Sequence, residues 1–241
     1  MQVKEKMLMD VKGLYEHGPV NIVIFGDSVS HAAFDGYQDY ESVYWNRLRK
    51  KLNEFREYVP VNMICAAIGG TTANLSLERL ERHVLIHQPD LVIVCFGLND
   101  VNGPLEDYLN ALQQIFEKCQ QAGCDVIFMT PNMLNTYVAG VALKKHREYA
   151  EVTAKIQNGG KMDQYMYAAI ELAESMGVTV CDCYSKWKKL AETQDTTRLL
   201  ANGVNHPTPE MHELFAESLY EVIIGKDTND KETCSTMFSN V

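Results

Sequence analysis

The sequence lacks any apolar run of the roughly 20 residues that a membrane-spanning helix needs. Its longest apolar runs, such as residues 91–96 (LVIVCF), have the length of strands. The first 18 residues interleave charges with apolar side chains and lack the apolar core of a secretory signal. These absences predict a soluble protein with no membrane partner and no export.

Positive charge is also scarce. The chain has 22 Lys and Arg against 32 Asp and Glu, a formal charge of -10 at pH 7. A surface of this charge repels phosphate backbones, so nucleic acid is not an expected partner. The sequence has neither a P-loop nor the G-x-G-x-x-G fingerprint of dinucleotide-binding folds, and we expect no cofactor.

Closely paired cysteines, as in structural metal sites, are nearly absent. Seven cysteines is an odd number, and several of them lie in or beside apolar runs, where free thiols pack as small hydrophobic groups. Cys181 and Cys183 are close in sequence, but no second close pair completes a ligand set. The pattern favours reduced thiols in a cytoplasmic protein and argues against a metal site.

What the chain does contain is an alternation of strand and helix patterns. Apolar runs predict buried strands at 21–25, 59–64, 91–96, 125–130 and 178–181. Helical periodicity covers 40–55, 74–87, 104–122, 162–176 and 209–224. This alternation indicates right-handed βαβ units and a parallel sheet. We expect a single domain over residues 1–225, followed by a polar tail at 226–241.

Ligands of open parallel sheets bind beyond the carboxyl ends of the strands. The long connection at 131–161 therefore has two interpretations: a substrate-side insertion, or a loop with an extra helix and no direct role. Four side chains that follow strand ends are weaker candidates for lining the pocket: His31, Tyr37, Met133 and Tyr137.

Four short motifs stand at predicted strand ends or at a helix start. Ser28 follows the first strand in FGDSVS, and Gly70 follows the second in AIGGTT. Asn99 follows the third strand in FGLND, and His206 precedes the last helix in NGVNHPTPE. A turn or a helix cap explains each motif when it is taken alone. Together they supply a nucleophile, two kinds of oxyanion donor and a base.

This order of motifs resembles the SGNH hydrolases, also called the GDSL esterase family. The resemblance implies a three-layer α/β/α sandwich whose five-stranded parallel sheet has the flavodoxin-like order. It also implies a serine esterase that forms an acyl-enzyme, with Ser28 as nucleophile and His206 as base. The oxyanion hole would consist of the Ser28 and Gly70 N–H groups and the Asn99 side chain. The expected substrates are small esters with short acyl chains, among them O-acetyl groups on carbohydrates.

One departure from the family is the acid of the triad. The family carries an Asp three or four positions before the His, where this chain has Gly203 and Asn202. A backbone carbonyl or the Asn202 side-chain oxygen orients the His in one interpretation, and a carboxylate from elsewhere, with Asp182 as candidate, does so in another. In the third interpretation the site is degenerate and the protein is a ligand-binding member of the fold.

A different hypothesis makes residues 69–72 an anion nest of a flavodoxin-like phosphate binder. That hypothesis leaves Ser28, Asn99 and His206 without a shared task. The sequence does not indicate the oligomeric state.

Overall fold

The computed structural model describes residues 2–142 and 144–225, and its centre is one parallel sheet in the order β2-β1-β3-β4-β5. The strands are β1 (Val20–Gly26), β2 (Val61–Cys65), β3 (Leu91–Cys95), β4 (Asp125–Met129) and β5 (Thr179–Cys181). The three central strands are almost wholly buried, as expected for apolar runs covered on both faces. The flavodoxin-like order predicted for the sheet is confirmed.

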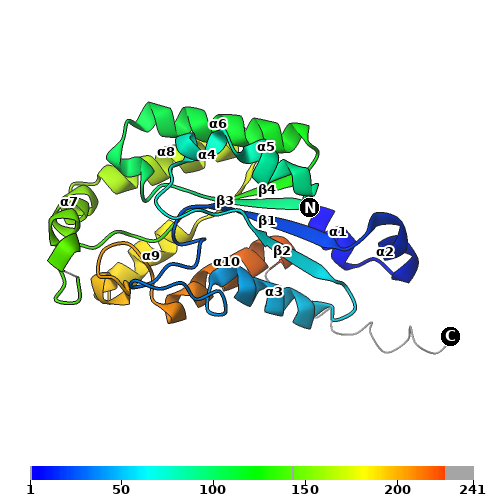
Figure 1. Ribbon diagram of the computed structural model, residues 1–241, viewed down its shortest axis with the longest axis horizontal. Coiled ribbons are helices and arrows are strands. Elements are labelled where there is room, and N and C mark those ends of the chain that lie inside the picture. The colour runs from blue at the N-terminus through cyan, green and yellow to red at the C-terminus, as the bar shows by residue number, and fades with distance from the viewer. Residues whose placement is uncertain (1, 143, 226–241) are drawn as a thin grey trace.

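Helices cover both faces of the sheet and complete the predicted three-layer sandwich (Figure 1). One face carries α3 (Tyr44–Phe55), α9 (Cys183–Ala191) and α10 (His212–Ile224), and the other carries α4 (Ala73–Leu77), α5 (Leu80–His83), α6 (Leu105–Gln121) and α8 (Lys161–Ser175). Helices α1 (Gln2–Met7) and α2 (Val11–His17) lie at one end of the sheet, and α7 (Arg147–Asn158) lies at the other. Short 3-10 helices are η1 (Leu85–His87), η2 (Asp100–Asn102), η3 (Lys144–His146), η4 (Thr196–Leu199) and η5 (Pro209–Met211).

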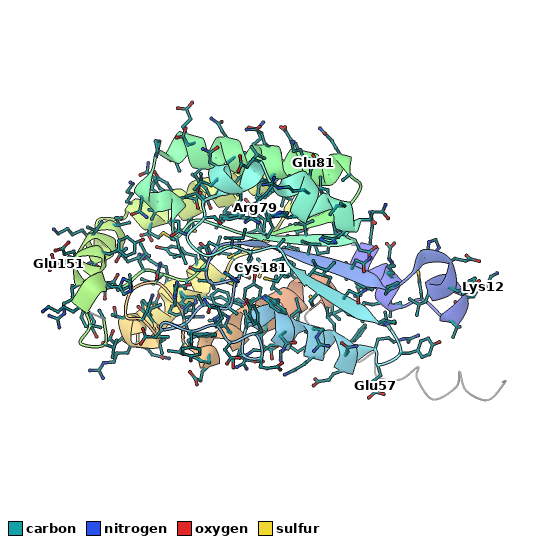
Figure 2. All side chains as sticks on the ribbon, viewed as in Figure 1. Lys12, Glu57, Arg79, Glu81, Glu151 and Cys181 are labelled. Atoms are coloured by element: carbon teal, nitrogen blue, oxygen red, sulfur yellow. The ribbon has the colours of Figure 1, made fainter. Side chains whose placement is uncertain are left out.

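Several element bounds differ from the sequence-based prediction for local reasons. Helix α3 starts at Tyr44 rather than at residue 40, because the Asp39 carboxylate accepts the N–H groups of Glu41 and Ser42 and holds a turn there. The helix predicted at 74–87 is broken into α4, α5 and η1. The break coincides with Arg79, whose guanidinium is buried between the sheet and the helices, over the Phe25 ring (Figure 2).

Other elements were not predicted at all, namely α1, α2 and α9, while the extra helix considered within 131–161 is present as α7. Within the two described ranges, no helix combines the length and the apolar character needed to cross a membrane. The predicted polar tail, residues 226–241, lies outside the described residues.

Because the strands are parallel, all their carboxyl ends meet at one end of the sheet. That end is where Figure 1 shows α7 and the loops that follow β1, β2 and β3. The sandwich therefore brings the four sequence motifs to the same place.

Candidate active site

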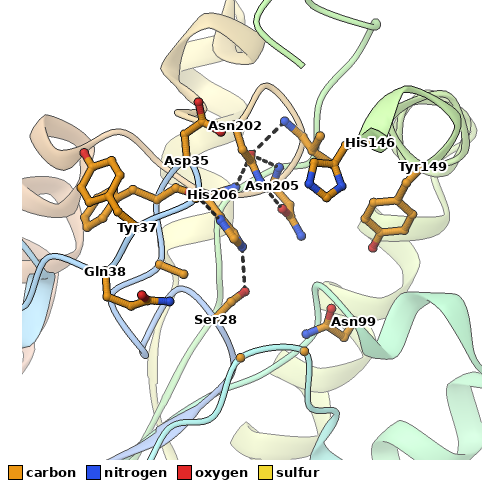
Figure 3. Close-up of a pocket in the computed structure, with 16 residues that line it drawn as sticks. Ser28, Asp35, Tyr37, Gln38, Asn99, His146, Tyr149, Asn202, Asn205 and His206 are labelled. Atoms are coloured by element: carbon orange, nitrogen blue, oxygen red, sulfur yellow. Dashed lines mark hydrogen bonds between the residues drawn. The ribbon is translucent and has the colours of Figure 1, made fainter. Parts of the chain in front are cut away.

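Ser28 and His206 are in hydrogen-bond contact although 178 residues separate them. Ser28 lies in the turn directly after β1, and its Oγ is 2.9 Å from His206 Nε2 (Figure 3). The turn depends on Gly26, since a Cβ there would lie 2.6 Å from the Cys95 carbonyl oxygen on the neighbouring strand. Within the turn, the Asp27 carboxylate accepts the Val29 N–H at 3.1 Å and so stabilises the turn.

The other ring nitrogen of His206 is held by the main chain. His206 Nδ1 lies 2.7 Å from the carbonyl oxygen of Phe34. A carbonyl only accepts hydrogen bonds, so Nδ1 carries the proton and Nε2 presents its lone pair to Ser28. Burial lowers the pKa of His206, and the Phe34 carbonyl opposes part of that shift. The ring is therefore neutral near pH 7, which is the form that accepts a proton.

The two residues nominated to orient the imidazole are engaged elsewhere, which corrects that expectation. Asn202 Oδ1 accepts the backbone N–H groups of Val204, Asn205 and His206, each at 3.0 Å. It therefore stabilises the turn and makes no hydrogen bond to the imidazole ring. Asp182 accepts the Ser185 N–H as the N-cap of α9 and also binds the Thr130 hydroxyl. Asn202 thus positions the main chain of His206, and Asp182 belongs to a helix start.

The structure also explains why no carboxylate stands three residues before His206. Gly203 has φ +65°, a conformation that side chains rarely adopt. A Cβ at this position would lie 2.9 Å from Val141 Cγ2 and 3.2 Å from Ala139 Cβ. The segment after β4 therefore occupies the space that a side chain at 203 would need.

Two residues of the cavity lining, Ser28 and Gly70, have backbone N–H groups without a backbone acceptor among the described residues. Gly70 has φ +77°, which only glycine adopts freely. The preceding Gly69 donates its N–H to His31 Nδ1 at 3.2 Å, and this bond ties the loop to the turn after β1. The two free N–H groups fit the oxyanion donors expected from the sequence.

Asn99 lies at the edge of the same cavity, half-buried. Its Nδ2 donates to the Thr71 carbonyl at 3.0 Å and, with a longer contact of 3.4 Å, to Asp27 Oδ2. A carboxamide has two N–H groups, so the Thr71 bond orients the amide while the second N–H is only weakly held. The amide is therefore placed to contribute a third donor.

Two buried carboxyl groups lie behind these donors. Burial, with a smaller contribution from Asp100, raises the pKa of Asp27 to about 7. Burial raises the pKa of Asp100 to about 6, and its Oδ1 accepts the Ala73 N–H at 2.8 Å. Both groups are therefore easier to protonate than a free carboxylic acid, and Asp27 is partly neutral near pH 7, which reduces the negative charge behind the oxyanion donors.

The cavity above Ser28 has a volume of about 500 Å³. Its lining combines the predicted site with polar and aromatic residues from two segments, Asp35, Tyr37 and Gln38 on one side of the Ser28–His206 pair and His146 and Tyr149 on the other (Figure 3). The segment 131–161 thus contributes His146 and Tyr149 to the cavity wall, as the substrate-side interpretation predicts.

Of the four weaker pocket candidates, Tyr37 lines the cavity. Met133 is buried in the core, the Tyr137 hydroxyl donates to Asp195, and His31 Nδ1 accepts the Gly69 N–H. Sequence reasoning missed Asp35, Gln38, His146 and Tyr149, which carry no motif and lie far apart in the chain. In the described part of the chain, no group of three His, Cys, Asp or Glu side chains is placed to hold a metal ion.

Comparisons with known proteins identify the family and similar folds. The model of the GDSL-like lipase/acylhydrolase family matches residues 24–214. A search of curated proteins finds no match.

Among solved structures, an acetyl-xylooligosaccharide esterase from Geobacillus stearothermophilus is similar with a TM-score of 0.67 and 19% identity, covering 86% of this chain and 95% of that one. The acetyl xylan esterase AlAXEase gives a TM-score of 0.67 and 21% identity over 85% of this chain and 100% of that one. An alpha/beta hydrolase from the metagenome of Lake Arreo gives a TM-score of 0.66 and 18% identity, covering 86% of this chain and 97% of that one. Catalytic mutants of the Geobacillus esterase replace a serine or an aspartate by alanine.

Proposed function

This chain belongs to the GDSL-like lipase/acylhydrolase family and is a carboxylic ester hydrolase, and from that premise we propose that it hydrolyses short-chain esters through an acyl-enzyme on Ser28. O-acetyl groups on carbohydrates are the substrate class that we place first. The observation that carries the proposal is the 2.9 Å contact between Ser28 Oγ and the unprotonated His206 Nε2.

In the first half of the reaction, Ser28 Oγ attacks the ester carbonyl while its proton passes to His206 Nε2. The tetrahedral intermediate then collapses, the bond to the alcohol oxygen breaks, and the imidazolium returns the proton to the leaving alcohol. In the second half, water attacks the acyl carbonyl while His206 takes its proton, and the imidazolium returns that proton to Ser28 Oγ as the bond between Oγ and the acyl carbon breaks. The carboxylic acid leaves and the serine is restored.

Negative charge gathers on the former carbonyl oxygen in both halves. The Ser28 and Gly70 N–H groups are free to stabilise it, and the loosely held N–H of Asn99 adds a side-chain donor. Donors that are already oriented do not have to reorganise during the reaction, which is why one such group is typically worth ~10²–10³ in kcat. We assign these three groups to the oxyanion hole.

In place of the missing acid, the Phe34 carbonyl orients the imidazole ring of His206. It selects the tautomer with the proton on Nδ1 and fixes the ring plane toward Ser28. A neutral carbonyl supplies only a partial negative charge to the imidazolium, so we infer a Ser-His dyad rather than a triad. The Geobacillus esterase, for which an aspartate mutant is called catalytic, differs from this chain in that respect.

The preference for small acyl groups on polar alcohols rests on two supports. The cavity has room for an acetyl group together with a much larger alcohol, and its walls carry hydroxyl, carboxamide and imidazole groups. Two similar structures are of enzymes named for acetylated xylan or its oligosaccharides. The hydroxyl, carboxamide and imidazole groups of the lining can hydrogen-bond to sugar hydroxyls, whereas a lipid chain offers them no partner.

The test is covalent labelling with a fluorophosphonate probe, which reacts with activated serines, followed by peptide mass spectrometry. We expect labelling at Ser28, and its loss in Ser28→Ala and in His206→Ala. His83→Ala, which changes a histidine on the surface helix α5, serves as a matched control and should label normally. Hydrolysis of 4-nitrophenyl acetate should follow the same pattern. Absence of both labelling and hydrolysis in well-folded protein would instead support the ligand-binding hypothesis.

A further inference from the structure

The cavity wall beside His206 combines a free carboxylate with an open aromatic face. We propose that this wall, formed by Asp35 and Tyr37, binds a positively charged nitrogen in the alcohol half of the ester. The inference rests on the proposed function and names a substrate class for it: esters of alcohols that carry an ammonium group, such as amino sugars and amino alcohols.

The described residues that line the cavity carry a negatively charged side chain but no lysine or arginine. Asp35 is the only acidic side chain among them. Asp35 is exposed and has no hydrogen bond or ion pair within the described part of the chain, whereas Asp27 and Asp100 are buried and bound. A carboxylate without a protein partner is available for a cation in the cavity.

The aromatic face lies two residues further along the same loop. Tyr37 stacks on Phe34 with ring centroids 5.5 Å apart and an angle of 22° between the planes. Phe34 is buried, while Tyr37 is 50% exposed, so one face of the tyrosine is supported from behind and the other is open. A supported aromatic face attracts an ammonium group through its ring electrons, and a carboxylate on the same cavity wall adds a full negative charge.

The position of the wall assigns it to the alcohol half of the substrate. His206 must return its proton to the leaving alcohol oxygen, and Asp35 follows Phe34, the residue whose carbonyl holds the His206 ring. The Asn99 donor lies on the other side of the Ser28–His206 pair (Figure 3). A negative charge on the His206 side is thus kept away from the developing oxyanion. The same charge repels anionic esters.

The experiment compares two acetate esters of nearly equal shape. Acetylcholine carries a quaternary ammonium, and 3,3-dimethylbutyl acetate carries a neutral tert-butyl group in its place. We expect kcat/KM to favour acetylcholine by about 5- to 30-fold in the wild type, since the Asp35 carboxylate and, more weakly, the half-exposed Tyr37 ring both attract the cation. In Asp35→Asn the preference should fall to within about twofold, because the carboxylate contributes most of it.

Glu57→Gln is the matched control. It removes the same charge from an exposed side chain at the end of the molecule opposite α7 (Figure 2), and it should keep the preference. Equal rates for the two esters in the wild type would contradict the proposal, and so would a preference that survives Asp35→Asn. Hydrolysis of 4-nitrophenyl acetate without turnover of either ester would also contradict it.

A binding measurement separates this inference from the proposed function. Choline binding to Ser28→Ala, followed by calorimetry, needs no catalysis, and Asp35→Asn in the same background should weaken it at least fivefold. If fluorophosphonate labelling fails while choline binds in an Asp35-dependent way, the esterase proposal fails and the cation site stands. If labelling succeeds and choline does not bind, the cation site fails alone.

Discussion

At the scale of single residues, the site separates two tasks that a triad carboxylate combines. The acid of a serine triad selects the histidine tautomer and also stabilises the imidazolium, and its replacement by an amide costs ~10⁴ in kcat, chiefly through the wrong tautomer. Here the Phe34 carbonyl accepts a hydrogen bond from the Nδ1–H of His206, so the tautomer is fixed without a charged partner. The rate that remains must come largely from the oxyanion donors, which makes Asn99 the residue to test.

Asn99→Ala is expected to lower kcat by ~10²–10³ with little change in KM, because the amide acts on charge that develops only in the transition state. Steady-state kinetics with 4-nitrophenyl acetate measure both constants. Asn62→Ala, which removes an exposed carboxamide from β2, is the control and should leave them unchanged. A folded Asn99→Ala protein with wild-type kcat would refute the oxyanion role.

At the scale of elements, the loop that carries His206 is held by the segment at 131–161. Asn132 Nδ2 donates to the Asn205 carbonyl, and the Asn135 N–H donates to the Val204 carbonyl, each at 2.9 Å. Asn202 closes the loop from its own side through three backbone N–H groups. The segment therefore has two roles in the architecture: it contributes His146 and Tyr149 to the cavity lining, and it holds the loop that carries His206.

Gly203→Asp, which introduces an acid at the family position, is expected to destabilise the protein without raising activity. The new side chain meets Val141, and its charge is buried. Gly123→Asp is a matched control, since its φ of +80° is equally unfavourable but a Cβ there meets nothing within 4 Å. We expect the control to lose about 1 kcal/mol of unfolding free energy and Gly203→Asp at least about 2 kcal/mol more.

Urea unfolding of the three proteins, together with their esterase rates, measures this difference. A Gly203→Asp protein as stable as Gly123→Asp, and faster than the wild type, would show that the segment at 131–161 does not exclude an acid.

At the scale of the whole molecule, buried ionisable groups make stability depend on pH in opposing ways. Asp27 and Asp100 have raised pKa values in the folded protein. The stability that they contribute is therefore lost as pH rises and the two groups ionise. Burial lowers the pKa of His212 to about 3, so its contribution is lost as pH falls below 6.5. The two windows overlap between about pH 4 and pH 6.5, where the two carboxyl groups outweigh the single histidine. The combined contribution of these three groups is therefore expected to fall as pH rises from about 4 to 7.

Asp100→Asn isolates one of these effects. In the wild type, the Asp100 contribution is fully present below its ordinary pKa of 3.8 and is lost as pH rises through about 6. The variant keeps the oxygen that accepts the Ala73 N–H but does not titrate. Relative to the wild type, its unfolding free energy should therefore gain roughly 3 kcal/mol between pH 3.5 and pH 7.5.

Chemical unfolding at several pH values measures this gain. Asp107→Asn, which removes an exposed carboxylate at the start of α6, should run parallel to the wild type. If the unfolding free energy of Asp100→Asn also ran parallel to that of the wild type across this pH range, burial would not raise the pKa of Asp100.

The fold was predictable because its signals are local. Apolar runs of strand length, helical periodicity between them and glycines at strand ends specify a doubly covered parallel sheet. The order of the motifs then brings Ser28, Gly70, Asn99 and His206 to one end of that sheet. The nominations of Asn202 and Asp182 failed because a local task, capping a turn or a helix start, competes for each side chain.

The tertiary structure alone decided what completes the site. Any residue can supply a backbone carbonyl, so nothing in the sequence marks Phe34, which lies 172 residues from its His206 partner. The cavity walls bring Asp35 and Tyr37 opposite His146 and Tyr149 only after the sheet has formed. Sequence patterns record what neighbouring residues do for one another, whereas the partner of a buried polar atom is chosen by the three-dimensional path of the chain.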